Sequence, residues 1–143
     1  MTTGMAILQP VVVLAGWTMV MWFWMYATRL PAMTTANVDP DDLVLDPDKS
    51  LDAVLPPQVQ WKAHNYNHLH EAPTVFYAVA IVLAIIGQGD GLNAQIAWAY
   101  VGLRITHSVV QATVNRVKVR FALFAISSFC LMALVLHAAL AIL

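Results

Sequence analysis

Charged side chains are scarce in this sequence of 143 residues. Only 10% of the residues are Asp, Glu, Lys or Arg, 60% are hydrophobic, and the mean hydropathy is +0.69. A soluble globular protein has about 25% charged residues, so the composition indicates an integral membrane protein. The net charge of −1 leaves no basic surface for nucleic acid, and we expect none as a partner.

Cysteine is also nearly absent. Cys130 is the single one, which excludes an internal disulfide and with it the membrane dithiol–quinone oxidoreductases. We expect it to be a small buried hydrophobic residue. No Lys or Arg precedes Arg29, whereas a cleaved signal peptide begins with a positively charged region. The first apolar stretch is therefore expected to remain in the membrane as a helix.

Long apolar stretches dominate the rest of the chain. Each is long enough to cross a hydrocarbon core of roughly 30 Å, and a helix satisfies its own backbone polar groups inside lipid. The sequence therefore predicts an all-α fold, a single four-helix transmembrane bundle over residues 1–143. The four helices are expected at residues 6–29, 61–88, 92–115 and 119–142.

The distribution of basic residues predicts the orientation in the membrane. The connection at residues 30–60 contains five prolines and six aspartates, which predict a solvated loop without helix. Every Lys and Arg except Arg104 lies near this loop or near the short basic link at residues 115–120. The positive-inside rule places the loop and the link in the cytoplasm and both termini on the other side.

Polar side chains line up on two of the predicted helices. Residues at i, i+3, i+4 and i+7 share a helix face, which on a continuous second helix aligns His64, Asn67, His68 and Glu71. The same spacing on the third helix aligns Arg104, His107, Ser108, Gln111 and Asn115. Charged groups at this depth face a bundle interior or a watery cavity. We expect Glu71 to pair with Arg104.

Three interpretations of these faces are open. The first is a purely structural hydrogen-bond network between helices. The second is a metal site, because His64 and His68 have the i, i+4 spacing that binds zinc, with Glu71 or His107 as a further ligand. A neighbouring arginine would repel a cation and no HExxH motif is present, so we expect no metal.

The third interpretation is an anionic ligand held by Arg104 and Arg120. Arg120 lies where the fourth helix begins, beside the basic link. A guanidinium group matches the geometry of a carboxylate, so two of them at a cavity suit a carboxylate-bearing ligand.

The organisation of the chain resembles the MAPEG proteins, membrane-associated proteins in eicosanoid and glutathione metabolism. The segment "NYNHLHEAPTVFYA" is similar to the second-helix motif of that family, and "AWAYVGLRITHSVVQATVNRVKVR" to its third-helix signature. The spacing of Arg104, His107 and Arg120 is similar to the prostaglandin E synthase branch. The resemblance is to a divergent, bacterial-type member. It implies a homotrimer that binds glutathione between adjacent subunits, in sites that open towards the cytoplasm.

The resemblance carries over to individual residues in part. Four residues match family counterparts: Glu71, Arg104, His107 and Arg120. The motif asparagine of the second helix falls on His68, with Asn67 beside it, and arginines expected earlier in that helix fall on His64 and Asn67. The tyrosine of the third helix is Gln111 here, and the serine after the last arginine is Phe121.

The resemblance implies a glutathione-dependent transferase or peroxidase of the membrane. Its second substrate would be a hydrophobic electrophile or a lipid hydroperoxide that arrives from the bilayer. In this hypothesis Arg120 is the catalytic residue that stabilises the thiolate, and the tripeptide contacts His64, Asn67, His68, Glu71, Arg104, His107 and Gln111. The alternative is a non-catalytic lipid-binding or scaffold protein of the same family. A proton or ion pathway ranks third, because the first and fourth helices have few polar groups.

Overall fold

The regular structure of this protein is helical. A computed structural model describes residues 4–46 and 48–143, so that Pro47 of the predicted loop lies outside the described residues. Within these ranges there is no strand, which agrees with the predicted all-α class. The helices are α1 (Leu8–Thr35), α2 (Pro40–Leu45), α3 (Leu51–Val54), α4 (Pro57–His68), α5 (Ala72–Ile85), α6 (Leu92–Thr113) and α7 (Val117–Ile142).

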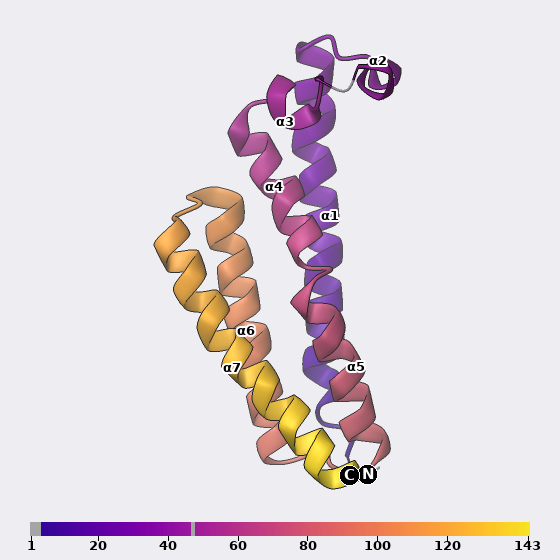
Figure 1. Cartoon of the computed structure of the whole chain (residues 1–143), viewed down its shortest axis with the longest axis vertical. Helices are drawn as coiled ribbons and strands as arrows, with labels where there is room; N and C mark the ends of the chain where they lie inside the picture. Colours follow the sequence, from indigo (N-terminus) through magenta and orange to yellow (C-terminus); the bar gives the residue numbers. More distant parts are fainter. Residues whose placement is uncertain (1–3, 47) are drawn as a thin grey trace.

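The long helices run side by side (Figure 1). Helix α1 extends along the molecule, α4 and α5 follow one another beside it, and α6 and α7 form an antiparallel pair. The start of α1, the link from α5 to α6 and the end of α7 gather at one end, which we call the terminal end. The short helices α2 and α3 lie at the opposite end.

Three helical segments are long and apolar enough to cross a membrane: Leu8–Thr35, Pro57–Ile85 and Val117–Ile142. They indicate an integral membrane protein. Helix α6 is not among them, although its 22 residues at about 1.5 Å each would also span the hydrocarbon core. Its polar residues lower the hydropathy, and several of them are buried against the other helices, including Asn93, Arg104, His107 and Gln111. The predicted number of four membrane spans is therefore supported for three segments.

The prediction that residues 30–60 contain no helix is wrong. Helix α1 continues through Pro31 to Thr35, because a proline removes one backbone hydrogen bond and can kink a helix without ending it. Pro40 begins α2 instead of breaking it, since the first helical position needs no N–H donor. Helix α3 follows Ser50, whose hydroxyl oxygen accepts a hydrogen bond from the Ala53 amide at 3.3 Å.

The second membrane segment is interrupted, in contrast to the continuous helix predicted at residues 61–88. Helix α4 ends at His68 and α5 begins at Ala72. Pro73 has no N–H to donate to the carbonyl of Leu69, and Glu71 has φ −94° and ψ −106°, outside the helical region. Residues before and after this break therefore do not share one helix face.

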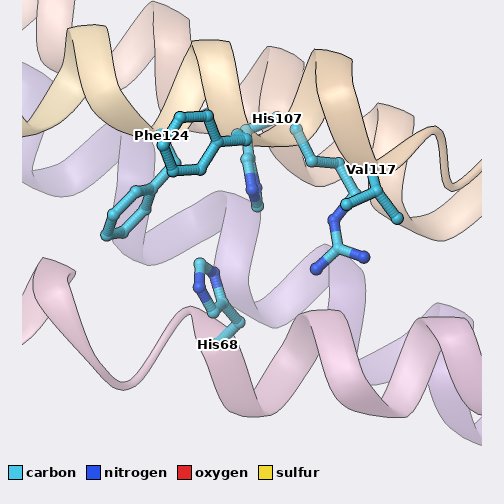
Figure 2. Close-up of a pocket in the computed structure, with 6 residues that line it drawn as sticks. His68, His107, Val117 and Phe124 are labelled. Atoms are coloured by element: carbon cyan, nitrogen blue, oxygen red, sulfur yellow. The ribbon is translucent and has the colours of Figure 1, made fainter.

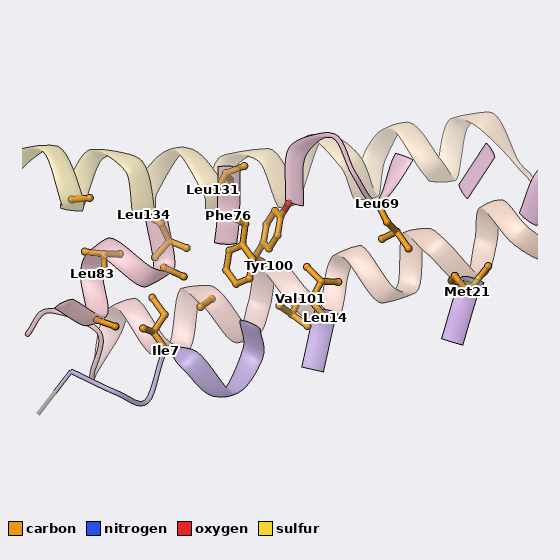
Figure 3. Packing of buried hydrophobic residues seen from close by; sticks show 14 of the residues in the cluster. Ile7, Leu14, Met21, Leu69, Phe76, Leu83, Tyr100, Val101, Leu131 and Leu134 are labelled. Atoms are coloured by element: carbon orange, nitrogen blue, oxygen red, sulfur yellow. The ribbon is translucent and has the colours of Figure 1, made fainter. Parts of the chain in front are cut away.

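The hydrophobic core lies between α1, α5, α6 and α7 and is shown in Figure 3. Its centre is a pair of stacked rings, Phe76 of α5 and Tyr100 of α6, whose centroids are 4.6 Å apart. Other buried members are Leu14, Met21, Leu83, Val101, Leu131 and Leu134. This core holds α6 against its neighbours and so determines where the polar side chains further along α6 meet α4 and α7.

The link between α5 and α6 packs tightly on the segment before α1. A Cβ at Gly89 would lie 2.0 Å from the carbonyl oxygen of Gly4, so only glycine fits there. The Ile7 amide donates to the carbonyl of Gly89 at 2.9 Å. Asp90 accepts hydrogen bonds from the amides of Gly4 and Ala6 at 2.5 and 3.1 Å. These contacts fix the terminal end of the bundle.

Candidate functional site

A cavity of about 230 Å³ lies where α4, α6 and α7 meet. Figure 2 shows His68 of α4 and His107 of α6 pointing towards one another, with Val117 and Phe124 of α7 beside them. The complete lining is His68, His107, Val117, Arg120, Phe121 and Phe124. Four residues that the sequence singled out, His68, His107, Arg120 and Phe121, are thus brought together from three helices.

Arg120 is positioned by the turn between α6 and α7. Asn115, just after α6, has φ +49°, the left-handed conformation that commonly ends a helix. Its side-chain oxygen accepts a hydrogen bond from Nη1 of Arg120 at 2.6 Å. The Nε of Arg120 is buried and has no hydrogen-bond partner among the described residues. Arg120 therefore places a cationic side chain in the cavity wall, with an N–H group that has no partner within the described residues.

Arg104 lies behind His68 and does not line the cavity. Its side chain is 1% exposed. Its Nη2 donates to Nδ1 of His68 at 3.0 Å and to the carbonyl oxygen of His68 at 3.3 Å. Its Nε and Nη1 are buried without a partner within the described part of the chain.

Aromatic contacts hold the two imidazole rings. The rings of His68 and His107 are stacked, with centroids 5.0 Å apart and planes 18° apart. The ring of Phe124 lies 6.0 Å from that of His68 and also 6.0 Å from the Arg104 guanidinium. The histidines are therefore held in place from two helices.

Gln111 and Ser108 continue the polar face of α6. Gln111 is 4% exposed, and its Oε1 has no hydrogen-bond partner among the described residues. Ser108 joins three helices: its hydroxyl oxygen accepts from Nε1 of Trp17 at 2.8 Å and from Nδ2 of Asn65 at 2.6 Å. The predicted alignment on α6 thus corresponds to a buried polar row for Arg104, His107, Ser108 and Gln111, whereas Asn115 lies in the turn beyond the helix.

Asn65 is a polar residue of this junction that the sequence reasoning missed. It is fully buried on α4, three residues before His68, and faces α6 through Ser108. The signal that was missed is this spacing of three residues, which puts Asn65 and His68 on one face of the helix. The prediction chose a face that began at His64 instead.

The predicted common face of His64, Asn67, His68 and Glu71 is not formed. His64 and Asn67 are exposed, and Nε2 of His64 lies 2.7 Å from the Asp52 carboxylate of α3. The predicted Glu71–Arg104 pair is also absent from the described residues. The break after His68 places Glu71 on the exposed side, with Oε2 at 3.5 Å from Nε2 of His68, and Arg104 bonds to His68 instead.

The charge around the cavity is positive. Arg104 and Arg120 lie at or behind its wall, and Arg116 and Lys118 are exposed at the start of α7. Glu71, the acidic residue in the break between α4 and α5, is exposed. No group of three metal-ligating His, Cys, Asp or Glu side chains occurs among the described residues. Guanidinium donors without partners suit an anion with several acceptor atoms.

The comparisons with known proteins identify the family. The MAPEG family model matches residues 7–140. The matched range runs from just before α1 into the last turn of α7 and includes every residue that lines the cavity. No curated protein and no solved structure matches the chain.

Proposed function

The chain belongs to the MAPEG family, and on this premise we propose that it is a glutathione-dependent membrane transferase or peroxidase. The family consists of membrane proteins of glutathione or eicosanoid metabolism. The observation that carries the finer proposal is Arg120, a cation in the cavity wall whose buried Nε–H has no partner among the described residues. Its second substrate is a hydrophobic electrophile or a lipid hydroperoxide.

The proposed role of Arg120 is to stabilise the thiolate of glutathione. A thiolate is the reactive nucleophile, and a free thiol has a pKa of about 8.5. A neighbouring guanidinium favours the charged form and lowers that pKa. The stabilisation comes from the guanidinium group itself, so it does not depend on the protonation of the two histidines nearby.

The residues around the cavity offer complementary groups for the rest of the tripeptide. His68 and His107 are in its wall. Gln111, buried one helical turn from His107, has a free acceptor oxygen within the described part of the protein that suits an amide or ammonium N–H. Arg104 lies behind His68 and would act on a ligand from there.

The size of the cavity supports a site that a second subunit completes. Ligand pockets usually measure about 300–1,000 Å³, whereas this cavity measures about 230 Å³. His64, Asn67 and Glu71 are exposed on the second membrane segment and could contact a ligand that extends beyond one chain. We therefore include a homotrimer in the proposal, with glutathione bound between neighbouring copies.

The proposal also includes an arrangement in the bilayer. Helix α6 is taken as a fourth span, because it packs against both α1 and α7 and runs antiparallel to α7 (Figure 1). The basic residues Arg116, Lys118 and Arg120 begin α7 at the end away from the termini. The positive-inside rule then makes that end cytoplasmic and the terminal end non-cytoplasmic.

A non-catalytic lipid-binding protein is the second candidate. The supporting observation is an apolar groove of about 430 Å³ between α5 and α7, lined by Val75, Ser128, Leu131, Met132, Val135, Leu136 and Ala139. Such a surface can accept an acyl chain. Gln111 also stands where the resemblance predicts a tyrosine hydroxyl, which removes one donor for a thiolate.

Titration of glutathione tests the proposed function. Purified protein in lipid or detergent would be titrated by calorimetry, and thiolate absorbance would be recorded in parallel. We expect saturable binding and a thiolate signal, both lost in Arg120→Ala. Arg116→Ala is the matched control, because Arg116 is exposed on the same turn and does not line the cavity. No binding at millimolar glutathione, with a lipid that co-purifies in stoichiometric amount, would contradict the enzyme and favour the second candidate.

A further inference from the structure

We propose that Arg104 is a positioning residue that holds His68 in the tautomer with its proton on Nε2. His68 then presents an N–H donor, and no lone pair, to a ligand in the cavity. The step that concerns the ligand rests on the proposed function. The tautomer itself follows from geometry alone.

The tautomer follows from what each partner can donate. A guanidinium group has five N–H donors and no acceptor. Because Nη2 of Arg104 lies 3.0 Å from Nδ1 of His68, Nδ1 must be the acceptor. A neutral imidazole carries one proton, so that proton is on Nε2.

Arg104 binds the backbone at the same point. Its Nη2 also donates to the carbonyl oxygen of His68 at 3.3 Å. This carbonyl ends α4 at the helix break, and carbonyls at a helix end lack their usual intrahelical donors. One buried side chain of α6 therefore holds both the ring of His68 and the chain that carries it.

The surroundings prevent the ring from turning over. His107 stacks on one face, with planes 18° apart, and Phe124 lies close to the ring as well. Rotation by half a turn about the Cβ–Cγ bond would break the bond to Arg104 and put the Cδ2–H group, which cannot accept a hydrogen bond, in the place of Nδ1. The order of the two nitrogen atoms is thus set by contacts from α6 and α7.

The second ring nitrogen of His68, Nε2, is near the exposed side chain of Glu71. Nε2 lies 3.5 Å from the exposed carboxylate of Glu71, which is longer than a good hydrogen bond. Its proton is therefore free for a ligand. Arg120 lines the same cavity and is also purely a donor. The ligand group that reaches both must be an acceptor, such as a carboxylate or a thiolate.

Nitrogen NMR of the imidazole tests the tautomer without any ligand. Protein labelled with ¹⁵N-histidine would be measured in lipid near neutral pH, and His68→Asn would identify the signals of His68 among those of the five histidines. We expect an unprotonated Nδ1 and a protonated Nε2. Arg104→Lys retains a donor and should keep this pattern, whereas Arg104→Met should mix the tautomers. A protonated Nδ1 in the wild-type protein would overturn the proposal.

A double-mutant cycle tests the effect on the ligand. Loss of one positioned hydrogen bond costs about tenfold in affinity, so we expect Arg104→Met to weaken glutathione binding by about that factor. The side chain in His68→Asn keeps an N–H donor that does not depend on Arg104. Adding Arg104→Met to this variant should therefore change glutathione affinity little. An equal loss on both backgrounds would mean that Arg104 contacts the ligand itself. If glutathione does not bind at all, the proposed function fails, and the NMR result still decides the tautomer.

Discussion

The side chain of Asn115 accepts a hydrogen bond from Nη1 of Arg120 at 2.6 Å. Asn115 is also the residue with φ +49° that reverses the chain between α6 and α7. Asparagine is one of the few residues that adopt this conformation readily. The turn between the two helices therefore also orients the cation of the cavity.

Two substitutions of Asn115 separate these roles. Asn115→Gly suits the positive φ and removes the whole side chain with its hydrogen bond to Arg120, so we expect thermal stability to be retained and glutathione affinity to fall about tenfold. Asn115→Ala also removes the hydrogen bond and adds a backbone cost of about 1–2 kcal/mol. Calorimetry and thermal unfolding in the same detergent would measure both. Full affinity in Asn115→Gly would show that Arg120 needs no such support.

Gln111 offers a test in which stability and binding change in opposite directions. Its buried Oε1 has no partner within the described residues, and an unsatisfied buried polar group costs about 1–3 kcal/mol. Gln111→Leu should therefore raise the melting temperature while it lowers glutathione affinity. Thermal unfolding and titration of the same sample would measure the two effects. If stability rises and affinity is unchanged, Gln111 is no ligand contact.

Ser108 should be important for stability. Its hydroxyl oxygen accepts hydrogen bonds from Trp17 and Asn65, which come from two other helices. Ser108→Ala leaves both donors unsatisfied in the interior, and we expect a loss of about 1–3 kcal/mol in the free energy of unfolding. The matched control is Thr106→Ala on the same helix, because Thr106 is exposed and bonds only to its own turn at Gly102. Equal stability of the two variants would contradict the three-helix junction.

Asp90 makes the terminal end sensitive to acid. Hydrogen bonds from the amides of Gly4 and then Ala6 hold the pKa of its carboxyl below the ordinary 3.8. A carboxyl group with a lowered pKa in the folded state contributes stability above its unfolded pKa and loses it as the pH falls through the folded value. We therefore expect wild type to be more stable than Asp90→Asn at pH 6.

The same comparison in acid completes this test. At a pH below the folded pKa of Asp90 the carboxyl is protonated in both states, so the difference in melting temperature between wild type and Asp90→Asn should disappear. Thermal unfolding at several pH values from 6 downwards would measure it. A difference that stays constant over this range would show that the charge of Asp90 contributes nothing.

The sequence alone determined the class of protein and singled out residues that the structure places at one cavity. Low charge and long apolar stretches depend only on composition, and each membrane segment satisfies its own backbone, so helices could be predicted locally. The family motifs then indicated His107 and Arg120, which the fold brings to one cavity. Spacing on an unbroken helix, α6, also aligned His107, Ser108 and Gln111 correctly.

The tertiary structure decided which polar groups meet. The break between α4 and α5 separates Glu71 from the face of His68, and Arg104 then takes His68 as its partner. Within α4, Asn65 proved to be buried against Ser108 of α6 and His64 exposed, because the packing of α4 selects a face that spacing alone does not reveal. A helix-face pattern cannot foresee such results, because a single local break rotates every later residue and the partner of a buried charge depends on how helices distant in sequence pack.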